Sequence, residues 1–574
     1  MPSYSVRPLP ELKNADVFSE HPKLLSDLLF LRGISDIETA KDFLAPSFEK
    51  YNHDPFLLPD MEKAVVRILL AIEQKEKICI WSDYDCDGIP GGALLHDFFK
   101  LIGYENFVNY IPHRHLEGYG LNEKGIESLA GDGVTLILTV DSGITDVKPV
   151  ARANELKIDV IVTDHHLPLR KKDPPTGGEV DDLPEALAVI NPKREDSAYA
   201  FDGLCGTGVA WKLIQAVLAK NRFGVAEGQE KWLLDLVGIA TVADMMPLVD
   251  ENRMLVHFGL VVLRKTRRPG LRKLYSILRL KPNTITEEDI GFSIAPRINA
   301  ASRMDMPRDA FDLLVAKTED EAHALARHLD KINNQRKGVV AATVKEAKKR
   351  LAEEGLPEGP IVMGNPSWRP GLLGLVANSL AETYNKPAFL WGREGGDTIK
   401  GSCRSDGVMS VVELMAEAKL AFLDFGGHKF SGGFSVSEEN IHGLKDALSL
   451  AYITLKMQQR AEEETFLDRE LALEEVGTAL SILAELGPFG IGNEKPIFLI
   501  PKAMLVSIKF FGKGGDHLEF VFADENKRKI SGITFFATPE DFTTHPKEGL
   551  RHDLVAHVER DWAGRARLRI VDVL

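Results

Sequence analysis

Short apolar runs that end in acidic or imidazole side chains recur near the start of the chain. The runs and the residues that follow them are Ile78–Trp81 before Ser82-Asp-Tyr-Asp-Cys-Asp-Gly88, Val134–Val140 before Asp141, and Asp159–Thr163 before Asp164-His165-His166. Short, β-rich apolar runs of this kind predict buried strands of a parallel sheet. Because ligands bind outside the carboxyl ends of such strands, we expect the polar residues to face one crevice.

The rest of the pattern predicts several further units. From 51 to about 330, strands and helices alternate, which is typical of a parallel sheet with crossover helices. Apolar residues between Leu325 and Leu351 follow three- and four-residue steps and predict a long helix over 320–352 that connects two domains. Residues 1–50 predict a helical segment that precedes the α/β unit.

The last part of the chain, residues 465–574, changes to strand-like runs between glycine-rich or charged turns. These runs are Leu505–Phe511, His517–Phe522, Ile530–Phe536, Leu554–Val558 and Arg567–Val573. They predict a five-stranded OB-type barrel, a fold that binds single strands by stacking bases on aromatic rings beside a basic groove. The aromatic candidates are Phe510, Phe520, Phe522 and Trp562, although strand alternation places most of them in the core. The phosphate-binding candidates are Lys509, Lys513, Arg565, Arg567 and Arg569, for which surface charge is the alternative.

Composition narrows the class of protein. The chain has 574 residues and a net charge of -15, so a nucleic-acid enzyme of this composition must concentrate its positive charge in a groove. Its four cysteines have neither metal-ligand spacing nor a disulfide pattern. No basic segment precedes an apolar stretch at the start, and no run is long enough to span a membrane. We therefore expect a cytoplasmic protein.

Each strand-end motif also has a structural interpretation. The Asp-x-Asp-x-Asp-Gly segment fits a calcium-type loop, but the position of the closing glutamate is Leu94. Asp141 fits a helix N-cap. Adjacent histidines on an extended chain face opposite ways, so we expect at most one of His165 and His166 to be a direct ligand. The coincidence of all three motifs favours a metal site.

Charge supports that interpretation, because clustered carboxylates must be protonated or neutralised by a cation. Carboxylate oxygens with one imidazole suit Mg²⁺ or Mn²⁺ better than a structural zinc. With Asp244 as a further candidate, the carboxylates balance two divalent cations, a common arrangement for phosphoester hydrolysis.

In order along the chain, four motifs resemble those of the DHH phosphoesterase superfamily: Ser82-Asp-Tyr-Asp-Cys-Asp-Gly88, Thr139-Val-Asp-Ser-Gly-Ile144, Asp164-His-His166 and Ala240-Thr-Val-Ala-Asp-Met-Met-Pro-Leu248. Later segments resemble the RecJ family of bacterial single-strand-specific DNA exonucleases within it. They include Ile111-Pro-His-Arg114, Glu117-Gly-Tyr-Gly120, Ala295-Pro-Arg-Ile-Asn-Ala-Ala-Ser-Arg-Met-Asp305, Gly401-Ser-Cys-Arg-Ser405, Gly426-Gly-His-Lys429 and Leu486-Gly-Pro-Phe-Gly-Ile-Gly-Asn493. The resemblance implies a DHH domain over 51–330, a connecting helix over 320–352, a smaller α/β DHHA1 domain over 355–460 and the OB-like domain over 465–574.

The resemblance also implies roles for individual residues. Asp85 would bind one divalent cation, Asp87 with His165 and Asp244 the other, and Asp141 both. Asp164 and His166 would orient ligands or water beside them. The residues implied to stabilise transition-state charge are Arg297, Arg303 and His428. Those implied to bind the 5′-phosphate and the strand are Arg114, Tyr119, Ser402 and Arg404.

The implied activity is 5′→3′ degradation of single-stranded DNA to mononucleotides in DNA repair and recombination, with Mn²⁺ or Mg²⁺ as cofactor. The sequence has no Walker motif, so we expect no nucleotide cofactor, and strand separation then requires a partner helicase, together with a single-strand-binding protein. The alternatives are a DHH/DHHA1 phosphodiesterase that cleaves short oligoribonucleotides or cyclic dinucleotides, and a catalytically inactive replication scaffold. The C-terminal barrel argues against the first and the intact aspartates against the second.

The chain departs from the family pattern at a few positions. Cys86 stands where the family commonly has alanine, and Ser82 and Ser302 stand where glycine is usual. Trp81 stands where related phosphatases often have a histidine ligand. Because the aspartates and the Asp164-His165-His166 triplet are all present, we expect an active enzyme.

Overall fold

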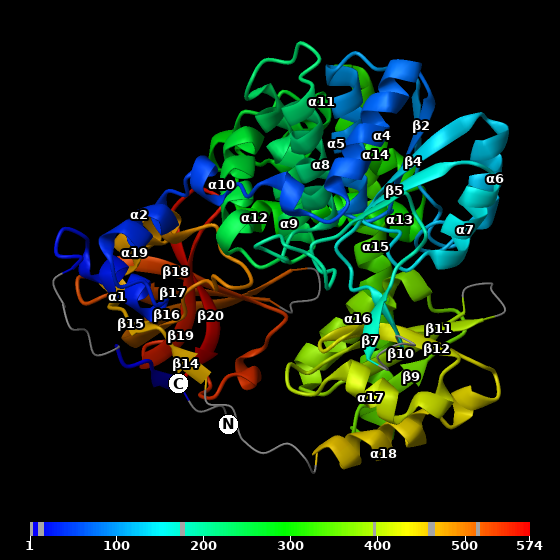
Figure 1. Cartoon of the computed structure of the whole chain (residues 1–574). Helices are drawn as coiled ribbons and strands as arrows, with labels where there is room; N and C mark the ends of the chain where they lie inside the picture. Colours follow the sequence, from blue (N-terminus) through cyan, green and yellow to red (C-terminus); the bar gives the residue numbers. More distant parts are fainter. Residues whose placement is uncertain (1–3, 10–16, 173–177, 394–397, 457–464, 513–516) are drawn as a thin grey trace.

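The computed structural model describes residues 4–9, 17–172, 178–393, 398–456, 465–512 and 517–574. An α/β body, a smaller sheet domain and a barrel are visible as separate parts of the chain (Figure 1). The helix α15, Glu319–Glu354, runs from the α/β body to the smaller domain. No described helix is long and apolar enough to cross a lipid bilayer.

The α/β body contains a five-stranded sheet in which every strand is parallel to its neighbours. In the order β3-β2-β4-β5-β8, its strands are Phe107–Tyr110, Lys77–Ser82, Val134–Val140, Asp159–Thr163 and Ala188–Ile190. The parallel sheet predicted from the apolar runs is therefore confirmed. Alternate residues of the strands enter two different cores: Ile78 and Ile80 one, Cys79 and Trp81 the other. Both faces of the sheet are therefore covered.

Helices cover the two faces of this sheet. The residues packed on one face come mainly from α4 (Met61–Gln74), α5 (Gly88–Leu101) and α8 (Gly206–Lys220). Those on the other face come from α6 (Glu123–Gly131) and α7 (Val147–Glu155). The helices that follow are α9 (Leu234–Ala243), α10 (Asp250–Arg264), α11 (Pro269–Leu278), α12 (Glu287–Asp289), α13 (Ala295–Met304) and α14 (Arg308–Val315).

The smaller domain has a mixed five-stranded sheet of order β12-β13-β11-β10-β9. Only the β9–β10 pair is parallel. The strands are β9 (Ile361–Gly364), β10 (Ala388–Gly392), β11 (Ile399–Arg404), β12 (Asp424–His428) and β13 (Ser431–Val436). The helices are α16 (Pro370–Tyr384), α17 (Val411–Glu417) and α18 (Leu444–Lys456). The domain therefore has the expected α/β character.

The C-terminal barrel is built from β16 (Phe498–Phe511), β17 (His517–Ala523), β18 (Lys529–Phe535), β19 (Arg551–Arg560) and β20 (Ala566–Val573). The long strand β16 pairs with β17 through its second half and with β19 through its first half. These two pairings close the sheet, and β18 and β20 complete it as a parallel pair. The predicted five-stranded OB-type barrel is confirmed.

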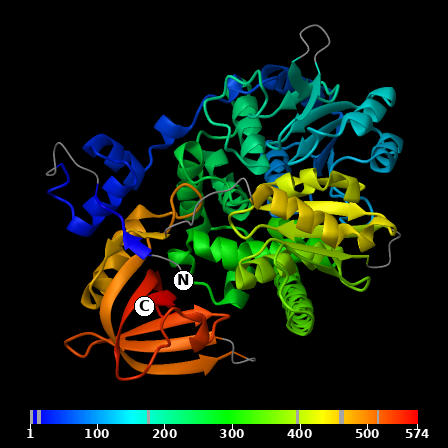
Figure 2. The same ribbon diagram turned by 90° about the horizontal axis from the view of Figure 1, so that it is seen from below.

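Residues 17–44 of the N-terminal segment pack against the barrel domain and not as a separate unit, whereas Phe48 belongs to the core of the α/β body. The elements of the segment are β1 (Tyr4–Val6), α1 (Lys23–Leu31), α2 (Ile37–Leu44) and α3 (Phe48–Tyr51), and β1 pairs with β14 (Thr465–Leu467). Leu25, Leu28 and Leu29 of α1 belong to the same core as barrel residues and α19 (Val476–Leu486). Figures 1 and 2 both show the N-terminal helices beside the barrel. Local periodicity predicted helices here, but it carried no information on this distant partner.

This packing leads to a stability prediction. Leu28→Ala removes a fully buried side chain from the shared core and is expected to destabilise the barrel by about 3 kcal/mol, because a cavity remains. Hydrogen exchange of the β16 and β19 amides measures the effect, and Lys23→Ala at the exposed start of the same helix is the control. Unchanged barrel protection in Leu28→Ala would show that the two parts are energetically independent.

Candidate metal centre and substrate groove

Seven acidic or imidazole side chains meet at the carboxyl ends of β2, β4 and β5 and at the end of α9. Their possible ligand atoms form overlapping groups of three. Within each group, the three atoms lie within 4.8 Å of one another. The groups are Asp83, Asp85 and Asp141; Asp87, His165 and Asp244; and Asp141, His165 and His166. All of the predicted metal ligands are therefore brought together, with Asp141 shared between groups.

Asp87 is held rigidly by the N-terminus of α8. Its carboxylate accepts hydrogen bonds from the backbone N–H of Gly206 at 2.6 Å and of Thr207 at 2.8 Å. A helix N-terminus offers unpaired N–H groups and a partial positive charge, so it stabilises a buried carboxylate. A Cβ atom at Gly206 would lie 2.6 Å from the Asp141 Cβ, and the glycine therefore permits the close approach of α8 to the strand ends.

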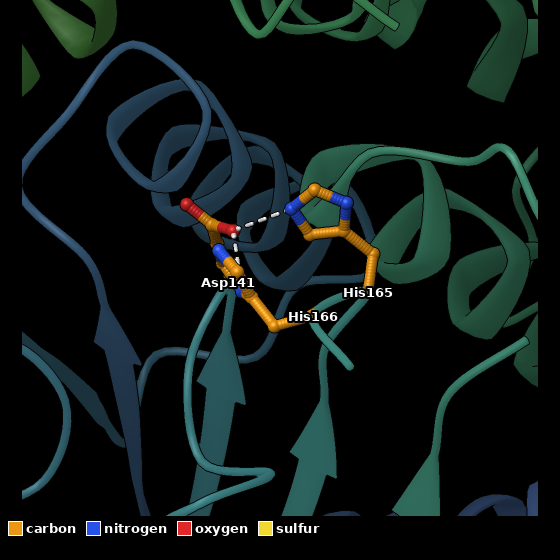
Figure 3. Close-up of side chains that lie close together, drawn as sticks. All are labelled: Asp141, His165 and His166. Atoms are coloured by element: carbon orange, nitrogen blue, oxygen red, sulfur yellow. Dashed lines mark ion pairs between the residues drawn. The ribbon is translucent and has the colours of Figure 1, made fainter. Parts of the chain in front are cut away.

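Asp141 lies at the centre of the cluster. Its backbone has a φ of 60°, a left-handed conformation that turns the chain sharply after β4. Its Oδ1 lies 3.2 Å from His165 Nε2 and 3.8 Å from His166 Nδ1 (Figure 3). The side chain is therefore placed to share its carboxylate between two neighbouring ligand sets.

His165 faces the same cluster from the end of β5. Its Nε2 lies 3.5 Å from Asp244 Oδ2 and 3.7 Å from Asp87 Oδ2. Burial lowers the pKa of His165 to about 4, which favours the neutral imidazole that binds metal ions.

His166 has a different environment. Its Nδ1 is 2.8 Å from Asp164 Oδ1, and Asp164 also accepts from the backbone N–H of Ile144 at 3.0 Å. Burial opposes charge on both groups, but their mutual hydrogen bond and attraction prevail, raising the pKa of His166 to about 9 and lowering that of Asp164 to about 2. The Tyr119 hydroxyl donates to the Asp141 carbonyl at 3.1 Å and also contacts His166 Nδ1. Asp164 and Tyr119 thus fix the orientation of the second histidine.

The polar atoms of the cluster fit divalent cations. Burial and neighbouring carboxylates raise the pKa of Asp83 and Asp141 well above the usual range, and raise that of Asp244 to about 8. Among the described residues, Asp83 Oδ1, Asp141 Oδ1 and Asp244 Oδ2 are buried without a hydrogen-bond partner. Buried, unpaired carboxylate oxygens are costly unless a cation neutralises them. Hard oxygen donors with one imidazole are appropriate for Mn²⁺ or Mg²⁺.

Sequence reasoning missed Asp83 as a ligand. It is the first aspartate of the alternating segment, is 3% exposed and forms a group with Asp85 and Asp141. Its alternation with Asp85 and Asp87 was visible in the sequence and was the signal for it. Lys193 was also missed: after burial and nearer charged groups, its positive charge contributes to lowering the pKa of His165, Asp244 and His428.

Trp81, at the position where related phosphatases often have a histidine ligand, is a packing residue in this structure. Its ring stacks on Tyr110 with centroids 4.0 Å apart, and its Nε1–H donates to the Gly120 carbonyl. The indole is fully buried and forms part of the wall behind the strand ends. Asp83 supplies a carboxylate to the neighbouring group, so the tryptophan does not leave that group without ligands.

Four arginines gather where the α/β body faces the smaller domain. The charges of Arg114, Arg336 and Arg404 all act on Arg303, and burial together with these charges lowers the pKa of Arg303 to about 9. Arg303 donates to the Gly371 carbonyl of α16 at 2.8 Å, which joins the two domains. Arg114 lies over the Tyr84 ring at 4.8 Å. Such a concentration of positive charge is what an acidic protein needs in order to bind a polyanion.

Arg404 and Ser402 reach this region from β11. They alternate with the buried Cys403 and therefore lie on the same face of the strand. A Cβ at Gly374 of α16 would be 2.7 Å from Arg404 Nη2, so the glycine makes room for the guanidinium. In the described chain Arg404 has no ion pair, and its Nη1 donates to the carbonyl of Cys403.

The other two predicted groove residues differ in their contacts. His428 at the end of β12 is an exposed residue, and partial burial of its ring together with the charges of Arg404 and Lys193 lowers its pKa. Arg297 instead donates to Asp330 on α15 and to the Ser293 carbonyl. The described structure gives Arg297 no contact with the metal-ligand groups, and its observed role is to brace α13 against α15.

Family models match three parts of this chain. The DHH family, N-terminal domain, matches residues 77–241, the DHHA1 domain matches 358–452, and the RecJ OB domain matches 467–571. These ranges lie in the α/β body, the smaller domain and the barrel, respectively.

Several named relatives match most of the chain. The Bacillus subtilis (strain 168) single-stranded-DNA-specific exonuclease RecJ is 35% identical over 88% of this chain, which spans 62% of the relative's length. The RecJ proteins of Haemophilus influenzae and Salmonella typhimurium are 31% and 30% identical, over 89% and 85% of this chain and 88% and 84% of their own.

A solved structure supports the same relationship. RecJ from Thermus thermophilus in complex with Mn²⁺ matches all of this chain and 79% of its own, with a TM-score of 0.80 and 26% identity. The same protein in complex with Mg²⁺ has a TM-score of 0.74. Because relatives named RecJ are 30% or more identical to this chain and are covered over most of their own length, the chain belongs to the RecJ family of single-stranded-DNA-specific exonucleases.

Proposed function

We propose that this chain is a metal-dependent exonuclease that degrades single-stranded DNA from the 5′ end to mononucleotides, in the cytoplasm, during DNA repair and recombination. The observation that carries the proposal is the cluster of Asp83, Asp85, Asp87, Asp141, His165 and Asp244 in one chain with an OB-type barrel. Such a cluster suits phosphodiester hydrolysis, and such a barrel suits single strands.

Two divalent cations fit the ligand groups. Asp83 and Asp85 would hold one, Asp87, His165 and Asp244 the other, and Asp141 both. Mn²⁺ or Mg²⁺ in these positions would supply an activated water and neutralise charge on the phosphoryl oxygens.

Residues around the proposed cations would orient water and substrate and stabilise charge. The His166–Asp164 pair fixes an imidazole beside the ligands, where it orients water or substrate through hydrogen bonds. Arg303 places positive charge at the joint between the domains, and His428 would face the same groove. These groups would stabilise the negative charge on the phosphoryl oxygens during cleavage.

Selection of the 5′ end is proposed to come from Arg114, Ser402 and Arg404. An exonuclease must distinguish a terminus, and a terminal phosphate carries charge that an internal diester lacks. Arginine forks and a hydroxyl suit that group. Because Arg114 and Arg404 belong to different domains, the pocket would close across the groove and fix the distance from the 5′ end to the metal ligands.

The aromatic candidates of the barrel divide into core and surface residues. Phe520 and Phe522 are buried in the core, whereas Phe510 is 58% and Trp562 87% exposed. Phe535, paired with His517 across β17 and β18, is also exposed, and Arg569 lies 5.9 Å from its ring. In OB folds this strand pair and the adjoining loops bind oligonucleotides.

The predicted basic residues of the barrel are only partly available. Arg565 and Arg567 form ion pairs with Asp561 and Glu559, so neither is a free phosphate contact. Arg569 and Lys509 remain exposed in the described chain, while Lys513 lies outside the described residues. A helicase and a single-strand-binding protein are the proposed partners, because the sequence has no Walker motif with which to drive strand separation.

A nuclease assay tests the proposed activity. Oligonucleotides labelled at the 5′ or the 3′ end are incubated with the protein and Mn²⁺ or Mg²⁺. We expect 5′ label to appear at once as mononucleotide while 3′-labelled chains shorten progressively, and chelation of the metal to abolish both. Mononucleotide released first from the 3′ label would contradict the polarity. Preferential cleavage of RNA dinucleotides would support the short-RNA alternative.

A further inference from the structure

The first turn of α10 contacts four separate parts of the molecule with four consecutive side chains. Asp250 accepts from His53 near the N-terminal segment, and Glu251 binds the buried Lys212 of α8. Asn252 and Arg253 follow, and neither was identified from the sequence. Because α10 begins six residues after the ligand Asp244, this turn connects the metal centre to its surroundings.

Asn252 joins the two segments that carry Asp87 and Asp244. Its Nδ2 donates to the Gly203 carbonyl at 2.6 Å and to the Pro247 carbonyl at 3.1 Å. Gly203 precedes the α8 N-terminus that holds Asp87, and Pro247 follows Asp244. One fully buried amide therefore fixes the spacing between the backbones behind both ligands.

Asp244 depends on this backbone for its position. Its Oδ2 has no hydrogen-bond partner among the described residues. The chain then turns through Met245, which has a φ of 56°, and Met246 N–H donates to the Thr241 carbonyl. Because no hydrogen bond holds Oδ2, the path of residues 245–248 determines where the carboxylate points.

A loop of the barrel domain contacts the end of this segment, at Leu248 and Val249. Leu248 N–H donates to the Ile491 carbonyl at 2.7 Å. A Cβ at Gly490 would lie 2.9 Å from Leu248 Cδ1, and one at Gly492 would lie 2.9 Å from Val249 Cγ1. The 486–493 loop is thus seated directly on the segment that follows Asp244.

Arg253 fastens this loop to the α/β body. Its guanidinium donates to the carbonyls of Leu486, Gly487 and Pro488 in the loop. It also donates to the Phe43 carbonyl and lies over the Phe43 ring at 3.7 Å. The residue is 5% exposed and has no carboxylate partner in the described part of the chain. A buried charge satisfied by carbonyls of one loop requires that loop to stay docked.

We propose that Arg253 is a positioning residue for the metal centre: by docking the 486–493 loop on residues 245–248, it makes the barrel domain part of the support of Asp244. Loss of this docking releases the backbone behind Asp244 and weakens cation binding at the Asp87, His165 and Asp244 group. Within the described part of the chain, Asp83, Asp85 and Asp141 form no hydrogen bond with the 486–493 loop or with residues 245–248. The inference rests on the proposed metal-dependent function.

Direct cation binding tests it. Mn²⁺ is titrated into the full chain and free Mn²⁺ is followed by electron paramagnetic resonance. In Arg253→Met we expect affinity for one class of bound Mn²⁺ to fall about 10-fold, the size of effect seen when groups supporting ligands are removed. The Mn²⁺ concentration for half-maximal nuclease activity should rise by the same factor, and the maximal rate should recover at high Mn²⁺.

Controls separate positioning from general loss of structure. Arg222→Met is the matched control, because Arg222 also donates to backbone carbonyls, of Val225 and Ala226, but does not contact the barrel. It should bind Mn²⁺ like the wild type. If Arg253→Met does not fold, the same Mn²⁺ titration is made with Arg253→Lys, which keeps the positive charge but loses the several N–H donors of the guanidinium.

Two results would overturn the inference. One is a folded Arg253 variant with wild-type Mn²⁺ affinity. The other is a variant whose rate falls at every Mn²⁺ concentration without a change in the half-maximal concentration, which is what a smaller folded fraction produces. Absence of nuclease activity in the wild type would instead contradict the proposed function, and the Mn²⁺ titration would still test the positioning role.

Discussion

Asp141→Asn is expected to lower kcat/KM on single-stranded DNA by about 10³-fold or more, because in the proposed site its carboxylate would neutralise both cations. Asparagine is the appropriate replacement, since it tolerates the left-handed backbone at this position better than alanine. Rates are measured on a labelled oligonucleotide at saturating Mn²⁺. Near wild-type turnover would show that the ligand assignment is wrong.

The same variant should have an opposite effect on the stability of the protein without metal. Asp141 lies among carboxylates that raise its pKa, so removing its charge relieves repulsion in the folded state. We expect thermal unfolding in a chelator to shift to higher temperature and the stabilisation by added Mn²⁺ to shrink. Asp146→Asn is the control: this half-buried carboxylate accepts from the Leu121 N–H and belongs to none of the metal-ligand groups.

The sequence predicted the parts of the site that depend on local order. An apolar run that ends in a carboxylate identifies a buried strand and places the carboxylate at its end, so Asp87, Asp141 and His165 could be found before their distances were known. Asp83 was missed because a residue directly after a strand also fits a turn, and only its burial beside Asp141 distinguishes the two.

Contacts between segments far apart in the chain could not be predicted from the sequence in the same way. The helices of residues 1–50 were predictable from periodicity, but their packing on the barrel depends on which apolar faces are complementary in three dimensions. Arg253 looked like an ordinary helical charge, because its four carbonyl partners come from segments on both sides of it in the sequence. Likewise, Arg297 belongs to a motif that favours a role in the groove, yet its guanidinium binds Asp330.

The 5′-phosphate pocket provides the second large expected effect. Arg404→Gln should reduce the preference for 5′-phosphorylated over 5′-hydroxyl oligonucleotides by about 10- to 100-fold in kcat/KM, because hydrogen bonds to a charged group are each worth about 1.5–3 kcal/mol. The competing interpretation is that Arg404 only pairs with Asp406. In the structure, Asp406 accepts from the N–H groups of Val408 and Met409, and the described chain contains no ion pair between Asp406 and Arg404.

The comparison requires both substrates with both proteins. Arg393→Gln is the matched control, because Arg393 is an arginine of the same domain that pairs with Glu438. It should keep the full preference, whereas Arg404→Gln should retain hydrolysis of the 5′-hydroxyl substrate, since the metal ligands are untouched. The pocket is refuted if the wild type does not distinguish the two substrates, or if Arg404→Gln distinguishes them as well as the wild type does. A preference lost in Arg404→Gln and kept in Arg393→Gln would place the terminal phosphate on β11, across the groove from Asp141.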